Sequence, residues 1–309
     1  MADRAGRDAG TVLASIGGVY QVELDSGNVV DSSLRGRLKL EQRTGDRVVV
    51  GDRVHVQRQD DGEHTIEAVD ERRSLLARSA PGKNHRRAKV IVANIDQVVA
   101  VFAAALPEPR LRMLDRFLVL AEANALPAAI ILNKSDLADA RPALRPYIDA
   151  GYPVLFTSVK QRAGLDQVRD RLCGHWSVLT GPSGVGKSSL LNVIQPGLGL
   201  AVGDVSETAQ KGRHTTVSAR LIRLDCGGYV ADTPGLRELG LWGVDSDTLP
   251  ACFPEFRLRR DDCRFGHSCS HSHEPDCAVR AAVSAGEIDA GRYRGYLAMR
   301  EGDAPAGSN

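Results

Sequence analysis

The sequence predicts three units: an all-β barrel, an α/β unit with a doubly wound sheet, and a small C-terminal unit organised by a metal. Short strand-like runs separated by turn residues fill residues 11–69. From residue 90, apolar runs alternate with helix-length segments, as in α/β domains. Three cysteines and three histidines crowd into residues 263–277. We set the predicted boundaries at residues 1–75, 76–238 and 239–309.

The composition excludes some partners and locations. Lys and Arg number 40 and Asp and Glu 39, so the bulk charge of +1 indicates no polyanionic partner and only local clusters could bind one. Charged residues interrupt the N-terminus, and the longest apolar run, 98–106, is too short to cross a bilayer. We therefore expect a cytoplasmic monomer without a membrane partner.

The first unit is expected to be a small barrel. Its strand-like runs are residues 11–14, 19–24, 48–50, 53–56 and 65–69, and no helix-length segment lies between them. An OB-fold is a five-stranded barrel of this kind that often binds nucleic acid. A barrel that serves only as a spacer is the alternative, because fold does not determine function.

A basic stretch, residues 72–89, follows the barrel. It holds seven Lys or Arg residues and no acidic one, and Pro81-Gly82 makes part of it a linker. Contact with a phosphate backbone and a solvated connector are both open interpretations.

The second unit alternates strands and helices. Its apolar runs are typical of buried parallel strands. The strands expected are 98–102, 128–132, 154–156, 176–180, 219–225 and 228–232, with helices at 110–124, 166–172 and 188–194.

Residues 181–189, GPSGVGKSS, carry the central motif. They match GxxxxGK[ST] and lie between an expected strand and an expected helix, the context that a phosphate-binding loop requires. Backbone N–H groups of such a loop point at phosphate oxygens, Lys187 would reach the β- and γ-phosphates, and the Ser188 hydroxyl would bind Mg²⁺. A glycine-rich turn that carries Lys-Ser by chance is the alternative. The nucleotide contacts expected from this loop are Gly181, Pro182, Ser183, Gly184, Val185, Gly186, Lys187, Ser188 and Ser189.

Residues 133–136 match NKxD directly after an expected strand. Asp136 could accept two hydrogen bonds from guanine that adenine cannot offer, which predicts GTP as the nucleotide. Asn133, Lys134 and Ser135 would complete this loop, although NKxD alone could be an exposed polar turn. After the next strand, Ser158 is expected to support the guanine, in a sequence where Val159 replaces the usual Ala.

A third motif, DxxG at residues 232–235, begins at the end of the expected strand 228–232. Asp232 would hold Mg²⁺ and the Gly235 N–H would sense the γ-phosphate. The polar segment 211–216 suits a mobile switch loop whose threonine completes the Mg²⁺ shell, and we favour Thr215 over Thr216.

The order of these motifs is rearranged. Ordinary small GTPases begin with the phosphate loop, whereas NKxD comes first in this chain. A compact domain that is cut and rejoined at surface loops keeps its site, so a circular permutation explains the order. The DxxG motif then leads directly into the C-terminal unit.

Together these motifs resemble the circularly permuted GTPases of the RsgA/YjeQ family over nearly the whole chain. The resemblance implies an OB-like barrel, a permuted P-loop GTPase domain and a zinc-binding C-terminal domain with helices. It also implies GTP hydrolysis that is stimulated by the small ribosomal subunit and its rRNA during ribosome biogenesis. A nucleotide-gated RNA-binding module with incidental hydrolysis is the competing interpretation.

Catalysis needs a group that the motifs do not supply. Leu236 stands where Ras-like enzymes place a water-orienting glutamine, which predicts slow intrinsic hydrolysis. In similar proteins the switch-loop histidine, here His214, is the suspected helper, but it could instead contact RNA or have no role. Val217 departs from a frequent family threonine, which leaves the choice between the two threonines open. The catalytic residues expected are Lys187, His214 and Gly235.

The Cys/His cluster predicts one structural Zn²⁺. Cysteines beside histidines in a reducing compartment indicate a metal rather than a disulfide, and Cys₃His is a common closed set. The family pattern gives Cys263, Cys269, His271 and Cys277, although one extra residue before Cys269 makes His267 an alternative to Cys263. The other cysteines, Cys173, Cys226 and Cys252, stand apart. Four flanking arginines are candidate rRNA contacts: Arg257, Arg259, Arg260 and Arg264.

Overall fold

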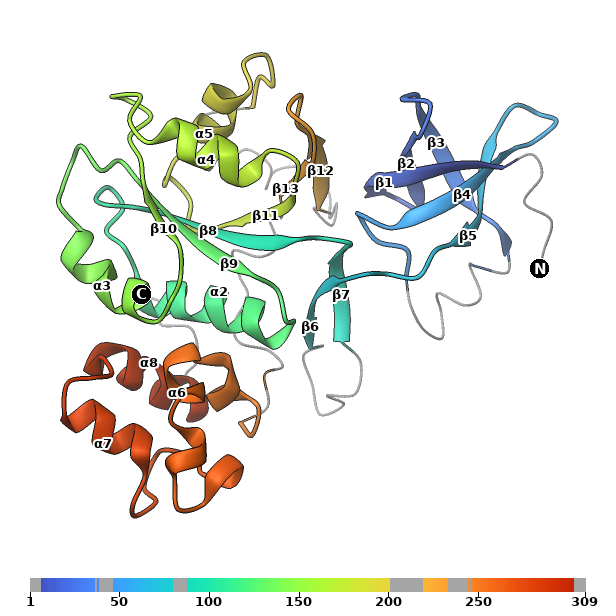
Figure 1. Ribbon diagram of the computed structural model, residues 1–309. Helices are drawn as coiled ribbons and strands as arrows, with labels where there is room; N and C mark the ends of the chain where they lie inside the picture. The colour runs from blue at the N-terminus through green and yellow to red at the C-terminus, as the bar shows by residue number, and fades with distance from the viewer. Residues whose placement is uncertain are drawn as a thin grey trace.

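The computed structural model describes residues 7–36, 38, 47–79, 88–200, 219–232, 244 and 246–302. It contains an N-terminal barrel, a central α/β unit and a helical C-terminal unit, which confirms the predicted fold class (Figure 1). Within the described part, none of the helices combines the length and apolar character needed to cross a bilayer.

The barrel consists of five strands. They pair in the order β1-β2-β3-β5-β4, and a β1–β4 pairing closes the ring. Alternate side chains point inward and form a small apolar core, which includes Val12, Val22, Val54 and Ile66. The strands are β1 (Asp8–Ile16), β2 (Val19–Leu24), β3 (Val29–Leu34), β4 (Arg53–Arg58) and β5 (His64–Val69).

One expected barrel strand is wrong. Residues 48–50 are not a strand of the barrel: the backbone N–H of Val49 donates to the Asp52 carboxylate at 2.8 Å, and Val50 forms only an isolated bridge with Val92 of β7 (Ala88–Ala93). The strand that completes the barrel is β3, which was not predicted. Its polar residues Asp31, Ser32 and Ser33 interrupt the apolar pattern expected of a strand.

The central unit has a six-stranded portion of one continuous sheet, in the order β10-β9-β8-β11-β13-β12. Neighbours from β10 to β13 are parallel and β12 is antiparallel to β13. The strands are β8 (Gln97–Ala103), β9 (Ala128–Asn133), β10 (Val154–Phe156), β11 (Trp176–Thr180), β12 (Arg220–Arg223) and β13 (Tyr229–Asp232).

Helices cover both faces of this sheet, as the doubly wound prediction requires (Figure 1). Along β8, Val98, Ala100 and Phe102 lie in the core under α2 (Leu111–Ala123) and α3 (Arg141–Asp149). The alternate residues Val99, Val101 and Ala103 share the opposite core with α4 (Leu165–Leu172) and α5 (Lys187–Ile194). Helix α3 was not predicted, because Pro142 and Pro146 mask its helical pattern.

The barrel and the central sheet are joined edge to edge. Strand β1 pairs with β12 at Ala14 and Arg220, which makes one 11-stranded sheet. Glu23 of the barrel accepts hydrogen bonds from Arg223 and, at 2.7 Å, from the Tyr229 hydroxyl. A separate two-stranded sheet, β6 (Leu75–Ser79) and β7 (Ala88–Ala93), lies at the same junction (Figure 1).

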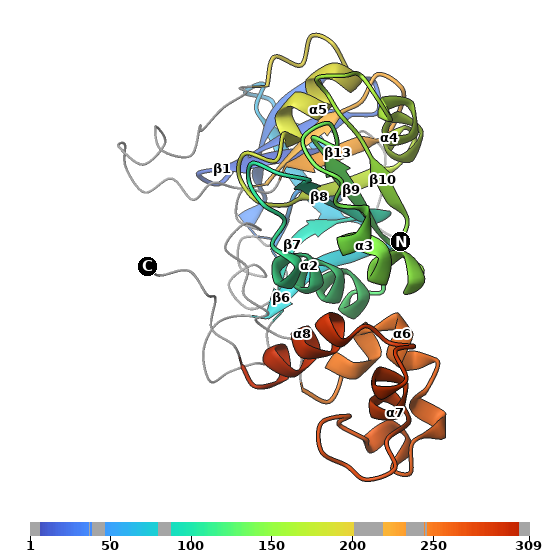
Figure 2. The ribbon, with the colours of Figure 1, turned by 90° about the vertical axis from the view of Figure 1, so that its left-hand side faces the viewer.

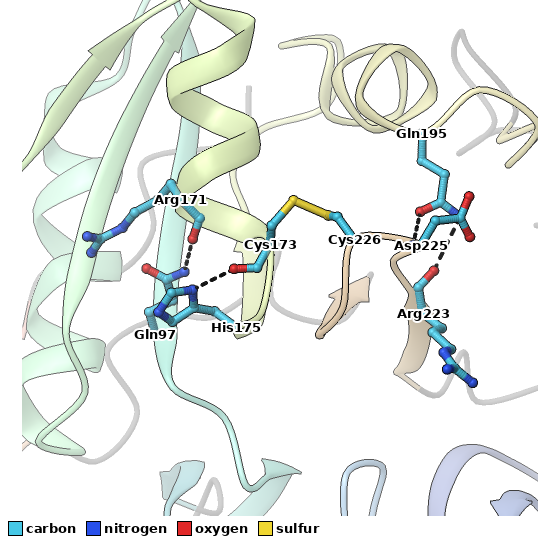
Figure 3. The surroundings of a disulfide bond; sticks show 8 residues. All are labelled: Gln97, Arg171, Cys173, His175, Gln195, Arg223, Asp225 and Cys226. Atoms are coloured by element: carbon cyan, nitrogen blue, oxygen red, sulfur yellow. Dashed lines mark hydrogen bonds between the residues drawn. A yellow bond between two sulfur atoms is a disulfide. The ribbon is translucent and has the colours of Figure 1, made fainter. Parts of the chain in front are cut away.

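A disulfide ties the central unit at the end of the sheet where β11 and β13 begin. Cys173, just after α4, and Cys226, in the turn between β12 and β13, have Cα atoms 5.3 Å apart and are bonded through sulfur (Figure 3). In the sequence these two cysteines stand apart, separated by 53 positions, so their pairing was not predicted.

The C-terminal unit packs against α2, on the side away from the sheet, in both ribbon views (Figures 1 and 2). A helix is expected from the sequence over residues 287–300, and it begins at Ala290, because the Asp289 side chain accepts the backbone N–H of Arg292 at 2.8 Å and caps it. Its helices are α6 (Pro254–Arg257), α7 (Ala278–Ser284) and α8 (Ala290–Arg300), with short 3-10 helices at Leu249–Cys252, Arg260–Asp262 and Gly266–Ser268.

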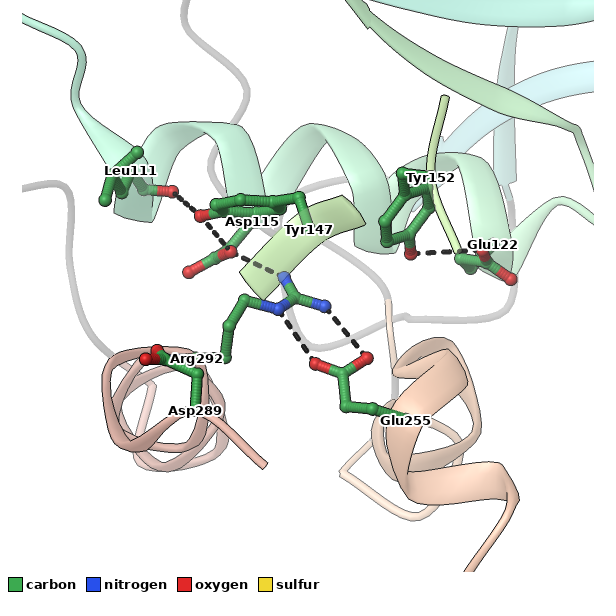
Figure 4. Close-up of polar contacts among 8 residues, drawn as sticks. All are labelled: Leu111, Asp115, Glu122, Tyr147, Tyr152, Glu255, Asp289 and Arg292. Atoms are coloured by element: carbon green, nitrogen blue, oxygen red, sulfur yellow. Dashed lines mark hydrogen bonds and ion pairs between the residues drawn. The ribbon is translucent and has the colours of Figure 1, made fainter. Parts of the chain in front are cut away.

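A buried ion pair joins this unit to the central one (Figure 4). Arg292 of α8 is only 3% exposed. Its guanidinium donates to Asp115 of α2 at 2.6 Å and to both carboxylate oxygens of Glu255 at 2.8 and 3.2 Å. The Tyr147 hydroxyl of α3 donates to Asp115 at 2.8 Å. Four helices therefore meet at one cation.

We predict that Arg292→Met lowers the free energy of unfolding by about 3–5 kcal/mol, because the buried carboxyl groups of Asp115 and Glu255 lose their cation and their hydrogen-bond donors. The matched control is Arg145→Met, which removes an exposed pair with Asp149 and should cost less than about 0.5 kcal/mol. Denaturant unfolding followed by circular dichroism measures both, and equal losses would contradict the assignment.

Candidate functional site

Four predicted motifs meet at one edge of the central sheet. Strands β9, β10, β11 and β13 are parallel, so their carboxyl ends lie together, where ligands bind in open α/β sheets. Residues 133–136 begin with Asn133 at the end of β9, 157–160 follow β10, 181–189 follow β11, and Asp232 ends β13.

Two glycines let the loop after β11 pass close to its neighbours. Gly181 has φ +141°, and a Cβ there would lie 2.0 Å from the carbonyl oxygen of Val101 in β8. Gly186 has φ +93° and immediately precedes α5, and a Cβ there would lie 2.4 Å from Nδ2 of Asn133. Only glycine fits at either position, so the loop's path depends on both.

Asn133 fastens this loop to β9. Its side chain is 2% exposed, its Nδ2 donates to the Val185 carbonyl at 2.9 Å, and its Oδ1 accepts from the Thr157 hydroxyl at 3.3 Å. The segments after β9, β10 and β11 are therefore held by one amide group. The Ser135 backbone N–H adds a bond to the Thr157 carbonyl at 2.9 Å.

Asp136 is oriented by Ser158. The fully buried Ser158 hydroxyl donates to Oδ1 of Asp136 at 2.6 Å. This hydrogen bond lowers the pKa of Asp136, so its carboxylate is ionised at neutral pH. A partly exposed carboxylate in a fixed orientation can accept paired N–H donors from a planar base.

Lys187 lies folded over its own loop. Its ammonium group donates to the carbonyl oxygens of Gly181 at 2.8 Å and Pro182 at 2.6 Å. These two carbonyls hold the cation beside the N-terminus of α5, where backbone N–H groups favour an anion. Ser188 and Ser189 occupy the first turn of that helix.

A further segment at this edge was missed by sequence reasoning. The loop after β8 brings the carbonyl of Leu106 to the Lys134 ammonium group, which donates to it. Pro107 approaches the phosphate-loop motif, since a Cβ on Gly184 would lie 3.7 Å from its Cδ. This loop, residues 104–110, matches none of the motifs recognised in the sequence, so nothing marked it in advance.

Asp232 is partly buried and lies opposite Leu179 of β11, two residues before Gly181. The remaining residues predicted for this site lie outside the described residues: His214, Thr215, Thr216, Gly235 and Leu236.

The C-terminal unit contains a compact Cys₃His group. The ligand atoms of Cys263, Cys269, His271 and Cys277 all lie within 4.8 Å of one another, and all four residues are buried. The Cys263 and Cys277 sulfurs are 3.9 Å apart, and Nδ1 of His271 lies 3.6 and 3.4 Å from them. A tetrahedral zinc with bonds of about 2.3 Å to sulfur places its ligands about 3.7 Å apart. The group therefore fits a metal ion.

Aromatic residues fix the histidine of this group. The Tyr293 hydroxyl donates to the His271 carbonyl at 2.8 Å, and the Phe256 ring lies 5.8 Å from the imidazole. Burial lowers the pKa of His271 to about 4, which keeps the imidazole neutral. His267, the predicted alternative to Cys263, is instead exposed and lies 3.3 Å from Asp261.

Most of the described basic residues predicted to meet RNA are engaged within the chain. Arg72 and Arg73 pair with Asp52 and Asp96 at the junction of the units. Arg257 of the C-terminal unit pairs with Glu122 of α2. Within that unit the ion pairs are Arg259–Glu287 and Arg264–Asp276, and Arg260 donates to the His267 carbonyl. The C-terminal pairs are largely exposed, and exposed ion pairs exchange partners at little cost.

Comparison with known proteins places these features in one family. The family model described as RsgA GTPase matches residues 69–242, and that described as RsgA N-terminal domain matches residues 9–66. A protein of Gemmatimonas aurantiaca, named small ribosomal subunit biogenesis GTPase RsgA, is 48% identical over 299 residues, which cover 94% of this chain and 96% of the relative. A Moorella thermoacetica protein of the same name is 44% identical over 93% of this chain and 94% of its own length.

Two solved structures are similar throughout. YjeQ from Thermotoga maritima superposes with a TM-score of 0.76 at 35% identity, covering 96% of this chain and 98% of that one. YloQ, described as a circularly permuted GTPase, has a TM-score of 0.73 at 30% identity, covering 100% of this chain and 99% of that one.

We predict that Asn133→Asp lowers the free energy of unfolding by about 1–3 kcal/mol, because a carboxylate oxygen would face the Val185 carbonyl in place of a donor. Asn28→Asp, at an exposed position, is the control and should change it by no more than about 0.5 kcal/mol. Thermal or denaturant unfolding of both variants tests this. An Asn133→Asp protein with an unchanged free energy of unfolding would show that the hydrogen bond to Val185 does not stabilise the fold.

Proposed function

The chain is a GTPase of the circularly permuted RsgA family, and we propose that it acts on the small ribosomal subunit during biogenesis of that subunit. The names of its full-length relatives support this proposal. The main structural support is for the GTP site: the Asn133 side chain donates to the Val185 carbonyl and so joins the NKxD segment to the phosphate-loop motif. The proposal includes the division at residues 75 and 238, a cytoplasmic location and a monomeric state.

Guanine is recognised by the loop after β9 in this proposal. Asp136 accepts the N1–H and N2–H₂ donors of the base, and Ser158 keeps the carboxylate ionised and oriented beforehand. ATP would leave this carboxylate unpaired, which disfavours it. Lys134, fixed by the Leu106 carbonyl, braces the loop beside the base.

The phosphates are held by residues 181–189. The Lys187 ammonium group exchanges the carbonyls of Gly181 and Pro182 for the β- and γ-phosphate oxygens. Ser188, Asp232 and Thr215 would hold Mg²⁺, which supplies charge neutralisation to the phosphates when bound. His214 and Gly235 are the proposed catalytic residues beside Lys187.

Hydrolysis depends on the partner because the chain lacks a water-orienting glutamine at Leu236. We propose that rRNA binds the barrel, the segment after it and the C-terminal unit together. The exposed arginine–carboxylate pairs of that unit can exchange their acids for RNA phosphates. Binding on both flanks would order the switch segment 211–216.

The Cys₃His group is proposed to hold one structural Zn²⁺. Three cysteines and one histidine form a closed ligand set, which leaves no position for a substrate. The ligand spacing and the burial of all four residues support this assignment.

Asp136→Asn is expected to weaken GTP binding about 10- to 100-fold and to shift preference toward xanthosine triphosphate, whose altered base edge matches an amide. Asp139→Asn on the same exposed turn serves as the control and should leave GTP affinity unchanged. Competition binding with GTP, ATP and xanthosine triphosphate is the measurement. Equal affinity of the natural protein for ATP and GTP would refute guanine recognition by Asp136.

Elemental analysis of the purified protein should find one zinc per chain. Cys277→Ser should lose the metal and make residues after 246 sensitive to protease, because the short C-terminal unit depends on the ion for folding. Cys252→Ser removes a buried thiol of the same core that is outside the Cys₃His group, and it should retain zinc. A metal-free natural chain that resists protease in this region would exclude the site.

GTP turnover should rise by about two orders of magnitude or more when small ribosomal subunits are added, and the stimulation should fall steeply with salt because phosphate contacts dominate binding. Lys187→Ala should abolish both rates, whereas His214→Ala should reduce stimulated turnover more than GTP affinity. Equal turnover with and without subunits, at low salt with Mg²⁺, would rule out a subunit-dependent GTPase.

A further inference from the structure

The Cys173–Cys226 disulfide lies where two non-contiguous segments are already held together by other bonds. The Gly174 backbone N–H donates to the Gly227 carbonyl at 2.8 Å, and the Tyr229 N–H donates to the His175 carbonyl at 3.0 Å. Gly228 has φ +81°, and a Cβ there would lie 2.3 Å from the His175 carbonyl oxygen. The backbone at both cysteines is therefore fixed without help from the sulfur bond.

The turn that carries Cys226 is held from a second side (Figure 3). The Gln195 side chain accepts the Asp225 N–H at 2.8 Å and donates to the Asp225 carboxylate at 3.2 Å. Because these bonds do not involve sulfur, the two thiols remain adjacent when the disulfide is reduced. Such preorganisation favours closure of the disulfide over reaction of each thiol alone.

This pair differs from the other cysteines of the chain. Cys252, Cys263, Cys269 and Cys277 are free and buried, and three of them belong to a group that needs thiols. Cys226 is exposed and Cys173 is half-buried. A small thiol or disulfide can therefore reach the pair without disturbing the Cys₃His group.

We propose that Cys173 and Cys226 are a reversible thiol–disulfide site whose redox partner is a low-molecular-weight thiol in its disulfide form. The Cys226 thiolate attacks one sulfur of that disulfide, forms a mixed disulfide and releases one small thiol. The Cys173 thiolate then attacks the Cys226 sulfur and releases the second. Two electrons pass to the small disulfide, and the two thiol protons end on the two released thiols. This proposal does not depend on the proposed action on the small ribosomal subunit or on GTP hydrolysis.

Oxidation closes a covalent loop over residues 173–226. That loop contains the whole 181–189 motif and the 211–216 segment. A cross-link of this span restricts the unfolded chain, so residues 173–226 should resist unfolding more strongly in the oxidised form. The free energy of unfolding of residues 173–226 should therefore rise when the surrounding thiols are oxidised and fall when they are reduced.

The test treats the full-length protein with oxidised glutathione and then with excess reduced glutathione. Thiols are blocked by alkylation after each step and the peptides are mapped by mass spectrometry. We expect a Cys173–Cys226 cross-linked peptide after the first step and its loss after the second. The midpoint of thermal unfolding should be higher in the oxidised form by about 5–10 °C.

Single variants distinguish this site from general thiol oxidation. Cys173→Ser should stop at a stable glutathione adduct on Cys226, because no second thiol resolves it, and should lose the thermal shift. Cys252→Ser should behave like the natural protein. Stable glutathione adducts on both cysteines of the natural chain, or a cross-link that forms only in denaturant, would overturn the proposal. The natural chain alone decides this even if a variant fails to fold.

Discussion

The hydrogen bond from the Asn133 amide to the Val185 carbonyl is the contact on which the nucleotide site depends. It joins segments 52 positions apart that follow different strands, and the missing Cβ of Gly186 gives the amide its room. A permuted chain keeps such a site because the bond lies across the sheet edge, not along the chain. The order in which β9 and β11 are connected does not matter to it, provided that both strands end at the same edge.

The parts of the site that the sequence predicted are those with local causes. Residues 181–189 require glycine and a following helix within one short segment, and residues 133–136 follow a buried strand directly. Cys263, Cys269, His271 and Cys277 are also close in sequence, so their types alone indicated a metal. The flanking strands were recognisable from continuous apolar runs, because parallel strands are buried on both faces.

The features that the sequence did not predict arise from contacts between distant residues. Arg292 and Asp115 are 177 positions apart, and either alone is an ordinary charged residue of a helix. Cys173 and Cys226 became a pair only through the turn geometry around Gly174 and Gly227. Residues 48–50 are as apolar as a buried strand, yet the Val49 N–H donates to the Asp52 carboxylate and not to a neighbouring barrel strand.

The ion pair between Arg292 and Asp115 joins residues on either side of the limit of the GTPase family model. The GTPase family model ends at residue 242, which marks a unit of recurrent sequence. Asp115 of α2 lies before residue 242, but the cation that pairs with its buried carboxylate, Arg292, lies after it. A fragment cut at residue 242 would uncover the face of α2 that carries Asp115 and would leave this carboxylate without its cation. The limit of the family model is therefore not a limit of the packing, because α8 supplies the counter-ion of a helix in the GTPase domain.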